Sequence, residues 1–322
     1  MKVLVVTNMY PHDGAPFNGI FVYEQVKAME RLYPEVKMDV YFINGKKSKI
    51  EYLISLFKVD MKIRKGKYDL VHIHFGLSGM YTLFPWRKRV PTIVTFHGSD
   101  IQRASTHNYW MVKISKQVAK RVDVAITLND NMDKLVRELG CKTYIIPCGV
   151  DSELFSPIKG LYKSEKEKKY CIIFPSDRKR QVKDFPLFEQ TVRILESKYK
   201  LNIVTCELKN MTRQEIADLF ARADVLLLTS KSEGSPQVVK EAMACNLPCV
   251  CTPVGDVSYL LDSVKDSFVS RKHDAEELAD LTAKSLLHQG VGITGRDRII
   301  EIGLDEKSVT KKLYQVYTDL CE

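Results

Sequence analysis

The sequence has no long hydrophobic run. The apolar residues near its amino-terminal end, 3–6, are fewer than the roughly 7–15 that a signal peptide needs, and no later run approaches the ~18 of a membrane span. With 45% hydrophobic and 28% charged residues, the chain has the composition of a soluble globular protein. Its 322 residues are too many for one ordinary core. We therefore expect a cytoplasmic protein of two domains.

Three common motifs are also absent. The eight cysteines include no C-x-x-C pair, and Cys249 and Cys251 stand too close together for a zinc or redox site. No G-x-G-x-x-G follows the first apolar run, which argues against a dinucleotide cofactor. The chain also contains no basic motif interleaved with aromatic residues, and this absence argues against nucleic-acid binding. We expect reduced cysteines, no metal, no cofactor and no nucleic-acid partner.

Positive charge is concentrated in the first half of the chain. The formal net charge is +9, and residues 1–155 hold 23 Lys and Arg against 15 Asp and Glu. This imbalance predicts an anionic partner on that side of the protein. Nucleic acid, a phospholipid surface and a phosphorylated acceptor each fit, and the charge alone does not choose among them.

Short β-branched runs alternate with longer amphipathic stretches along the chain. Most of the short runs are continuously apolar, as are strands of a parallel sheet that is covered on both faces. This order predicts an α/β protein of two Rossmann-like, doubly wound domains. We expect strands at residues 2–7, 38–43, 70–74, 92–96, 124–128 and 143–147, and then at 170–175, 201–206, 224–229 and 248–252.

The alternation is interrupted once, at residues 156–169. This stretch contains Pro157, Gly160 and a run of charged residues, which is typical of a linker. We therefore expect an N-terminal, acceptor-side domain over residues 1–158 and a C-terminal, nucleotide-sugar-binding domain over 159–305. A C-terminal helix over 306–322 could return to the N-terminal domain. Two such domains would face a central cleft, and α/β proteins bind ligands at such junctions.

The most specific motif is the segment 233–244, EGSPQVVKEAMA, which follows an expected strand. Gly234 and Ser235 form a turn, and Pro236 then starts a helix. Unpaired N–H groups at a helix start attract a phosphate. Glu233 and Glu241 could flank that phosphate and accept hydrogen bonds from sugar hydroxyls. The alternative is that both carboxylates only complement the helix dipole.

The spacing Glu-x7-Glu in this setting resembles the signature of the family-four retaining glycosyltransferases of GT-B fold. The resemblance covers most of the chain, from residue 2 to about residue 283. It implies a GT-B fold, a nucleoside-diphosphate-sugar donor and a retaining transfer that needs no metal. It further implies that Glu233 is catalytic and that the helix start binds the donor. The donor-binding residues would be Gly234, Ser235, Pro236, Gln237, Val238 and Glu241.

Other segments match the family in the same order along the chain. Arg178 and Lys183, five residues apart after the first strand of the second domain, resemble its diphosphate-binding pair. Arg offers a fork of donors and Lys a compact charge, and both suit a diphosphate that gains negative charge as it leaves. On this resemblance both are catalytic, with Arg180 as a rival for the arginine role. A solvated basic loop is the alternative.

Two segments of the first half match as well. Asn18 and Gly19 open a helix and resemble the donor-binding loop of the family, which often has two glycines there. His97 follows an expected strand and resembles the histidine that faces the donor sugar, and Asp100 comes three residues later. The resemblance makes Asn18 and Gly19 donor-binding and His97 catalytic, with Asp100 as a further candidate.

The expected function is therefore transfer of a hexose-type sugar from a UDP-, GDP- or ADP-sugar to a glycan or lipid-linked acceptor. Cell-surface polysaccharide or glycolipid assembly is the common setting of such enzymes. Two alternatives remain open: a nucleotide-sugar-binding protein without transferase activity, and a basic Rossmann-like protein that binds nucleic acid. The sequence does not name the base, the sugar, the acceptor or the linkage.

Residues 46–67 carry eight basic residues against two acidic ones. Apolar residues stand among them at Tyr52, Leu53, Ile54, Leu56 and Phe57. Such a segment could lie on an anionic bilayer, as a peripheral contact at the inner face of the cell membrane. The alternative is an ordinary amphipathic helix whose apolar side packs on the sheet and whose lysines lie in water.

Overall fold

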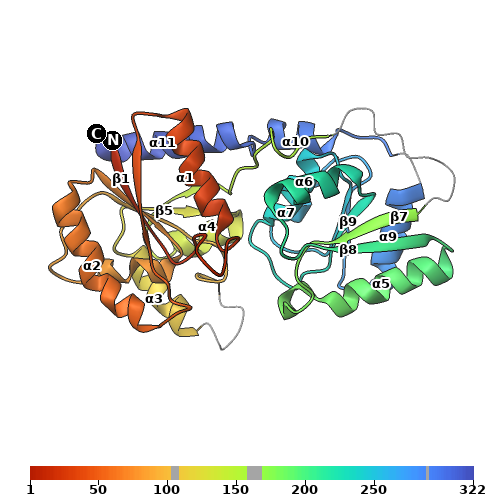
Figure 1. Cartoon of the computed structure of the whole chain (residues 1–322), viewed down its shortest axis with the longest axis horizontal. Coiled ribbons are helices and arrows are strands. Elements are labelled where there is room, and N and C mark those ends of the chain that lie inside the picture. The colour runs from red at the N-terminus through yellow and green to blue at the C-terminus, as the bar shows by residue number, and fades with distance from the viewer. Residues whose placement is uncertain (103–108, 158–168, 288–289) are drawn as a thin grey trace. The chain divides into compact units, whose positions relative to one another are not determined.

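The computed structural model describes residues 1–102, 109–157, 169–287 and 290–322. It divides into two compact units (Figure 1). Unit 1 comprises Met1–Gly149 and Glu306–Glu322, and unit 2 comprises Val150–Asp305. Residues 158–168 of the expected linker lie outside the described residues. Each unit is an α/β fold with a sheet of its own.

Unit 1 is built on a six-stranded parallel sheet with the strand order β2-β1-β3-β4-β5-β6. The direction of winding reverses between β1 and β3. Ligands of open α/β sheets bind outside the carboxyl ends of the strands at such a switch point. The strands are β1 (Lys2–Thr7), β2 (Lys37–Phe42), β3 (Leu70–His74), β4 (Thr92–Thr95), β5 (Val124–Thr127) and β6 (Lys142–Ile145).

Helices cover this sheet through apolar residues at helical spacing. Helix α1 (Ile20–Leu32) buries Val22, Val26 and Met29, which lie on one face three or four residues apart. Helix α4 (Asp130–Arg137) is capped by the side chain of Asn129. The others are α2 (Ile50–Gly66), the 3-10 helix η1 (Gly76–Leu83) and α3 (Tyr109–Ala119).

The C-terminal helix α11 (Glu306–Cys321) packs on unit 1 beside α1 (Figure 1). The ring of Tyr314 stacks on that of Tyr33, with 3.8 Å between the ring centroids. The hydroxyl of the buried Tyr317 lies 2.6 Å from Nδ1 of His72 on β3. The last helix therefore contributes directly to the core of the first unit.

Unit 2 repeats this topology with five parallel strands in the order β11-β10-β9-β7-β8. The reversal lies between β7 and β9, so their carboxyl ends form its switch point. The strands are β7 (Lys169–Phe174), β8 (Asn202–Glu207), β9 (Val225–Leu228), β10 (Cys249–Cys251) and β11 (Phe268–Val269).

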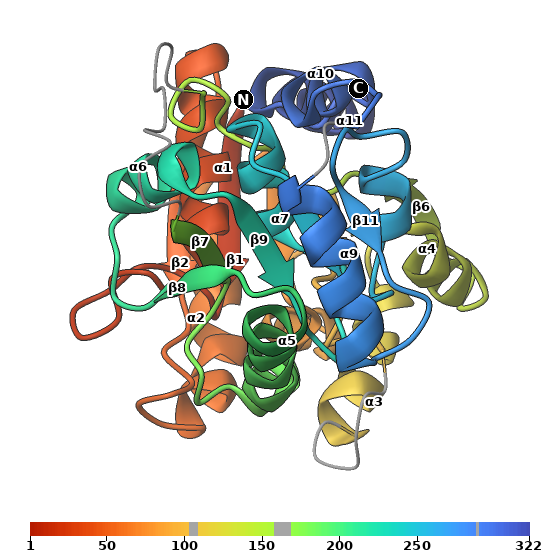
Figure 2. The ribbon, with the colours of Figure 1, turned by 90° about the vertical axis from the view of Figure 1, so that its right-hand side faces the viewer.

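Helices α5 (Phe185–Lys198) and α9 (Ala275–Leu287) lie next to each other in unit 2 (Figure 2). They close a core in which Phe174, Phe188, Leu195, Leu227 and Leu278 are all buried. Further helices are α6 (Arg213–Arg222), α7 (Gln237–Ala244), α8 (Val257–Leu260) and α10 (Gly295–Glu301), with a 3-10 helix η3 (Gln181–Lys183).

The predicted α/β class with two doubly wound units is confirmed. All ten expected strands are present, and each end lies within two residues of the expected one. Strand β11 was not expected, because two residues are too short to show an apolar run. None of the eight cysteines, all of which lie in the described part of the chain, forms a disulfide bond.

In the described part of the chain, no helix is both long enough and apolar enough to cross a membrane.

Candidate functional site

The loops that follow β7 and β9 are tied together at the switch point of unit 2. Oγ1 of Thr229, just after β9, lies 2.9 Å from the carbonyl oxygen of Lys183 and 3.1 Å from that of Asp184. The N–H of Lys231 donates to the carbonyl oxygen of Val182 at 2.8 Å. These bonds hold η3, which contains Lys183, against the end of β9.

Lys183 and Glu233 therefore meet. Nζ of Lys183 lies 2.5 Å from Oε1 of Glu233, and their side chains are only 10% and 15% exposed. Because little water reaches a buried pair, the charge of each side chain is stabilised mainly by the other side chain. Two residues that the sequence predicted to be catalytic, one from each loop, thus form a single ion pair.

Helix α7 begins directly after the turn that contains Glu233. Pro236 is its N-cap residue, and its side chain makes no hydrogen bond to the first turn. A helix start of this kind presents partial positive charge and N–H donors to an anion. Gln237 and Val238 occupy the first turn, and both are half-buried.

The loop after β10 packs against this turn. Gly255 has a φ of +57°, and a Cβ there would lie only 2.5 Å from the carbonyl oxygen of Gly234, so this close approach requires glycine. Asp256, the next residue, lies close to Ser235. Burial raises the pKa of Asp256, and the nearby Ser235 hydroxyl and Lys240 ammonium act in the opposite direction.

Three buried polar atoms at this edge of the sheet make no hydrogen bond of normal geometry in the described part of the chain, although the Ser235 hydroxyl lies near the Asp256 carboxylate. They are Oγ of Ser230, Oγ of Ser235 and Oδ1 of Asp256. Since buried polar groups are normally paired, their grouping indicates a place where a polar ligand completes the bonding. Sequence reasoning missed Asp256 and the wholly buried Lys240. A lysine between the apolar residues of α7 was the available signal for the latter.

The two candidate arginines differ in their contacts. The backbone N–H and Nε of Arg178 donate to the two oxygens of Glu207, at 2.8 and 2.7 Å, and its guanidinium lies over the ring of Phe185. Arg180 makes a long bond, 3.4 Å, from Nη1 to Oγ of Ser176. Both belong to the loop after β7. Arg178 and Arg180 both remain candidates for binding the diphosphate.

Glu241 is bound within unit 2. Its Oε1 accepts a hydrogen bond from Nη2 of Arg213 on α6 at 2.8 Å, and the Glu241 side chain is 4% exposed. The Arg213 guanidinium also lies over the ring of Phe155, 4.7 Å from its centroid. Nothing in the spacing of the motif pointed to Arg213. If Glu241 contacts the donor as predicted, its carboxylate does so while it remains paired with Arg213.

In unit 1 the carboxyl ends of β3 and β4 bring three histidines together. Nδ1 of His74 lies 3.3 Å from Nε2 of His97, and Nε2 of His72 lies 2.7 Å from Oγ1 of Thr95. Burial lowers the pKa of His97 and of His72 to about 3, and that of His74 also falls well below its usual value. All three rings are therefore neutral at physiological pH. His72 and His74 were not predicted, because they read as two polar residues in an apolar strand.

The predicted donor loop of unit 1 lies beside this cluster. Gly19 is the N-cap of α1 with a φ of +64°, and a Cβ there would lie 2.3 Å from the carbonyl carbon of Met9. Asn18 accepts from Lys46 and donates to the carbonyl oxygen of Tyr10 over 3.3 and 3.4 Å. The ring of Phe21, on the first turn of α1, lies 5.0 Å from that of His97. The start of α1 and His97 thus share one edge of the sheet.

Asp100 is wholly buried, and backbone groups occupy its carboxylate. Oδ1 accepts from the N–H of His97 at 2.9 Å, and Oδ2 accepts from that of Gly76 at 2.8 Å. Burial raises the pKa of Asp100 to about 6, although the backbone donors act against the rise. These bonds fix the loop that carries His97. Asp100 therefore acts on the cluster through the backbone in this structure.

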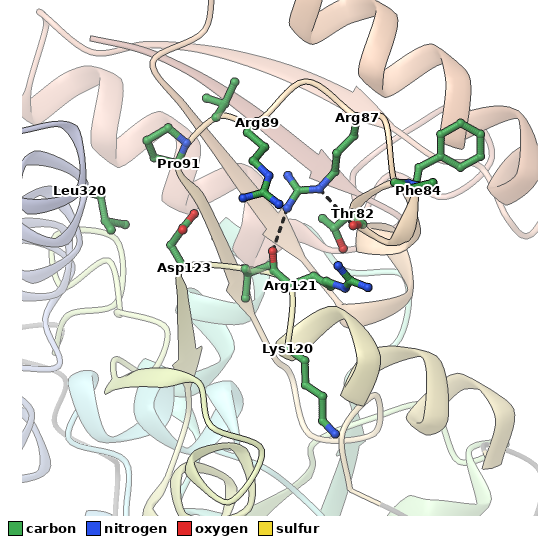
Figure 3. Close-up of a pocket in the computed structure, with 12 residues that line it drawn as sticks. Thr82, Phe84, Arg87, Arg89, Pro91, Lys120, Arg121, Asp123 and Leu320 are labelled. Atoms are coloured by element: carbon green, nitrogen blue, oxygen red, sulfur yellow. Dashed lines mark hydrogen bonds between the residues drawn. The ribbon is translucent and has the colours of Figure 1, made fainter.

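Unit 1 also holds a basic cavity of about 500 Å³ away from these residues (Figure 3). It lies next to the amino-terminal ends of β4 and β5, and its lining includes Arg87, Arg89, Lys120, Arg121 and Asp123. None of the residues predicted from the sequence lines it. The predicted residues instead gather at the carboxyl ends of the strands, in one group on each unit.

Two protein families match the chain. Glycosyltransferase family 4 matches residues 3–154, and the glycosyl transferases of group 1 match residues 189–288. Together the two matches span most of the chain. The chain is a glycosyltransferase with a family 4 domain and a group 1 domain. The family predicted from the Glu233 to Glu241 spacing is thereby confirmed.

Curated relatives agree with this assignment. A protein of Bacillus subtilis, TuaC, which is named as a teichuronic acid biosynthesis glycosyltransferase, is 23% identical over 87% of this chain and 88% of its own length. A UDP-Gal:α-D-GlcNAc-diphosphoundecaprenol α-1,3-galactosyltransferase of Escherichia coli is 25% identical over 83% of this chain and 79% of its own.

Solved structures show the same fold. Sucrose-phosphate synthase of Thermosynechococcus elongatus has a TM-score of 0.78 and 17% identity, over 99% of this chain and 98% of that one. HepE of Anabaena in complex with UDP has a TM-score of 0.71 and 15% identity, over 99% and 100%. The same protein in complex with UDP-glucose has a TM-score of 0.70 and 14% identity, over 99% and 100%. The predicted GT-B fold is confirmed.

Proposed function

We propose that this glycosyltransferase moves a hexose-type sugar, with retention and without a metal ion, from a nucleoside-diphosphate sugar to a glycan or lipid-linked acceptor. The observation that carries the proposal is the Lys183–Glu233 ion pair beside the start of α7, where the N-cap residue is Pro236. Charge, dipole and unsatisfied polar atoms meet at this switch point of unit 2. Such an arrangement suits a diphosphate with a sugar attached.

In this proposal the α7 turn and two cations bind the donor. Lys183, with Arg178 or Arg180, stabilises the diphosphate as it gains negative charge on leaving. The turn Gly234, Ser235, Pro236 and the first residues of the helix, Gln237 and Val238, approach the phosphates through their backbone. Glu241 accepts hydrogen bonds from the ribose, and Glu233 accepts them from the transferred sugar.

The residues of unit 1 act on the same donor. His97 is neutral, so it donates or accepts a hydrogen bond at the sugar without adding charge. Gly19 lets the backbone at the start of α1 come close to the donor, with Asn18 beside it. Asp100 holds the His97 loop in place.

Retention needs no attacking carboxylate if the acceptor approaches the face of the sugar from which the diphosphate leaves. The bond between the anomeric carbon and the leaving phosphate oxygen breaks, and the acceptor hydroxyl oxygen bonds to the same face of that carbon. The acceptor proton passes to the leaving phosphate oxygen. The protein then contributes positioning and electrostatic stabilisation.

The relatives support the choice of substrates. One neighbour in fold was crystallised with UDP and with UDP-glucose, and one curated relative takes UDP-Gal and a lipid diphosphate acceptor. We therefore put a UDP-sugar before a GDP- or ADP-sugar as donor. Polysaccharide assembly on a lipid carrier, at the cytoplasmic side of a membrane, is the setting that we propose.

The test uses purified protein, UDP-, GDP- and ADP-hexoses, and a lipid-diphosphate-linked N-acetylglucosamine acceptor. Mass spectrometry should find one hexose added to the acceptor, with the same yield in EDTA. NMR of the product should show the anomeric configuration of the donor. An inverted product would contradict retention, and loss of transfer in EDTA that Mg²⁺ restores would contradict metal independence. Donor binding without turnover would favour a nucleotide-sugar-binding protein.

A further inference from the structure

Helix α2 presents an apolar stripe on the side that faces away from the core. At about 100° per residue, four residues of α2 fall within about 80° of its circumference. Ile50, Leu53, Phe57 and Met61, which we name the outer stripe, are 61%, 57%, 63% and 48% exposed. The residues of α2 that the core buries, Ser55, Val59 and Ile63, lie on the opposite side of the helix. The outer stripe is therefore not used for folding unit 1.

The loop between η1 and β4 extends this apolar surface. The ring of Phe84 lies 5.3 Å from that of Phe57 and 4.7 Å from that of Trp86, both edge to face. Trp86 itself is 68% exposed. Its carbonyl oxygen accepts from Nη2 of Arg64 on α2 at 2.7 Å, which joins the loop to the helix. An indole held in this way has an apolar body and a polar N–H at a surface.

Lysines border the outer stripe along one side. Lys58, Lys62 and Lys65 on α2 have no ion-pair partner in the described part of the chain. The carboxylate of Asp60 is already occupied, because its two oxygens accept from Nε of Arg64 and the N–H of Lys88, each at 2.6 Å. The surface next to the outer stripe is therefore positively charged.

The basic cavity of about 500 Å³ adjoins this surface through Phe84, which lines it (Figure 3). Arg87 is fixed there, because it donates from Nε to the carbonyl oxygen of Thr82 at 3.0 Å and from Nη2 to that of Arg121 at 2.9 Å. The side chains of Arg89 and Arg121 are exposed beside it. This concentration of cations suits the phosphate of a head group.

We propose that unit 1 docks on an anionic lipid bilayer through the outer stripe and Trp86, with the lysines of α2 and the arginines of the cavity at the phosphates. Exposed aromatic and aliphatic side chains with lysines beside them fit an acyl and head-group boundary. A protein partner fits less well, because lysine is depleted in protein interfaces. The docking surface itself does not depend on the proposed function. Only the purpose of docking, which is to bring the enzyme to a lipid-linked acceptor, rests on that function.

The two interpretations of residues 46–67, an ordinary amphipathic helix and a contact with a bilayer, are compatible in this structure. Tyr52 and Leu56 pack toward the core of unit 1, as in an ordinary amphipathic helix, and the Tyr52 hydroxyl accepts from Asn8 at 2.7 Å. Leu53 and Phe57, by contrast, point to solvent. One helix therefore has a face for folding and a second apolar face for docking.

Flotation of the full chain with vesicles tests the docking. The protein should float with phosphatidylglycerol–phosphatidylcholine vesicles, remain unbound with phosphatidylcholine alone, and be released by salt. The variant L53S/F57S should lower the partition coefficient by at least about tenfold, because it removes two exposed apolar side chains. Each of Lys58→Glu, Lys62→Glu and Arg89→Glu should lower it by about fivefold or more. No flotation at low salt, or equal flotation with neutral vesicles, would overturn the proposal.

The two tryptophans provide a matched control, because Trp86 and Trp110 are both 68% exposed and are the only tryptophans in the chain. The variant Trp110→Phe keeps Trp86, and its fluorescence should shift to the blue when anionic vesicles are added. The variant Trp86→Phe keeps Trp110, and its emission should stay unchanged. A shift from Trp110, or from neither, would show that the assigned face is wrong.

Transfer to a soluble acceptor separates this proposal from the proposed function. L53S/F57S should keep wild-type turnover with a soluble acceptor and lose turnover with an acceptor embedded in vesicles. If the wild type floats but transfers to neither acceptor, the proposed function fails and the docking stands. If L53S/F57S is as active as wild type on vesicles, the docking has no part in catalysis.

Discussion

Nζ of Lys183 lies 2.5 Å from Oε1 of Glu233, so the cation that follows β7 is held by the carboxylate that follows β9. The two strands are neighbours at the switch point of unit 2. Hydrogen bonds of Thr229 and Lys231 to the backbone of η3 keep the pair in register. The pair is thus a product of the topology, and it stands at the place where this topology binds ligands.

Removing one partner of this pair should destabilise the protein. Lys183→Ala leaves Glu233 largely buried without its cation, and the free energy of unfolding should fall by about 3 kcal/mol. The double variant K183M/E233Q removes both charges and should recover most of this loss. Urea unfolding of the three proteins measures both effects. Equal stability of Lys183→Ala and wild type would mean that water reaches the pair.

The role of Glu241 can be separated from that of its partner. Glu241→Ala should raise KM for the donor with little change in kcat, because a ribose contact is the same in the ground and transition states. Arg213→Met breaks the same ion pair but leaves the Glu241 carboxylate in place. Both variants should therefore melt at lower temperature, while only Glu241→Ala changes KM strongly. If both shift KM equally, Glu241 acts only through the ion pair.

Two glycines of the loop before α1 provide a matched comparison. Gly14 and Gly19 both have positive φ, +83° and +64°, but a Cβ at Gly14 meets nothing, whereas one at Gly19 would overlap the backbone of Met9. Gly14→Ala should cost about 1 kcal/mol of stability through its backbone alone. Gly19→Ala should cost a further 1–3 kcal/mol, roughly, through overpacking. It should also weaken donor binding. Equal melting temperatures and equal donor KM values in the two variants would argue against a tightly fitted donor loop.

The histidine cluster should make unit 1 sensitive to acid. Burial lowers the pKa of His97 and His72 to about 3, whereas an unfolded histidine has a pKa of about 6.5. Their contribution to stability is therefore complete above about pH 6.5 and is lost as the pH falls toward about 3. Asp100 acts in the opposite sense below about pH 6, because its pKa is raised to about 6 by burial. The free energy of unfolding should fall on acidification, and less steeply in His97→Asn.

The same shift predicts the pH profile of the enzyme. Because His97 is neutral in the folded protein across the neutral range, kcat/KM should show no acid limb near pH 6.5 that belongs to this residue. His97→Asn should lower kcat/KM without changing the shape of the profile. An acid limb near pH 6.5 that disappears in His97→Asn would show that the ring titrates in the free enzyme and that the cluster is more open to water.

Much of this architecture could be predicted from local patterns. Continuously apolar runs such as Val225–Leu228 identify parallel strands, and the turn at Gly234 marks the start of α7. The ion pairs could not be predicted in this way. Lys183 and Glu233 are fifty positions apart, and Arg213 shows no motif at all, so only the folded sheet brings these partners together.

The outer stripe of α2 illustrates the same limit. Leu53 and Leu56 look equivalent in the sequence, yet one points to solvent and the other packs toward the core. Periodicity identifies an amphipathic helix, but α2 is apolar on two sides, and the side that faces the sheet depends on contacts made elsewhere in unit 1. The histidines at the end of β3 were missed for a similar reason, because their partners come from β4 and α11.

The most direct test of the central claim measures the release of nucleoside diphosphate with acceptor present. A panel of UDP-, GDP- and ADP-hexoses is offered to wild type, Lys183→Ala and Lys179→Ala. Lys179 is an exposed lysine of the same loop and is the matched control. At least one donor should be turned over by wild type and by Lys179→Ala, and kcat in Lys183→Ala should fall by about 10²-fold or more, the scale of a lost oxyanion donor. Thermal melting confirms that each variant is folded at the assay temperature. Turnover of no donor by wild type, or wild-type kcat in Lys183→Ala, would contradict the account.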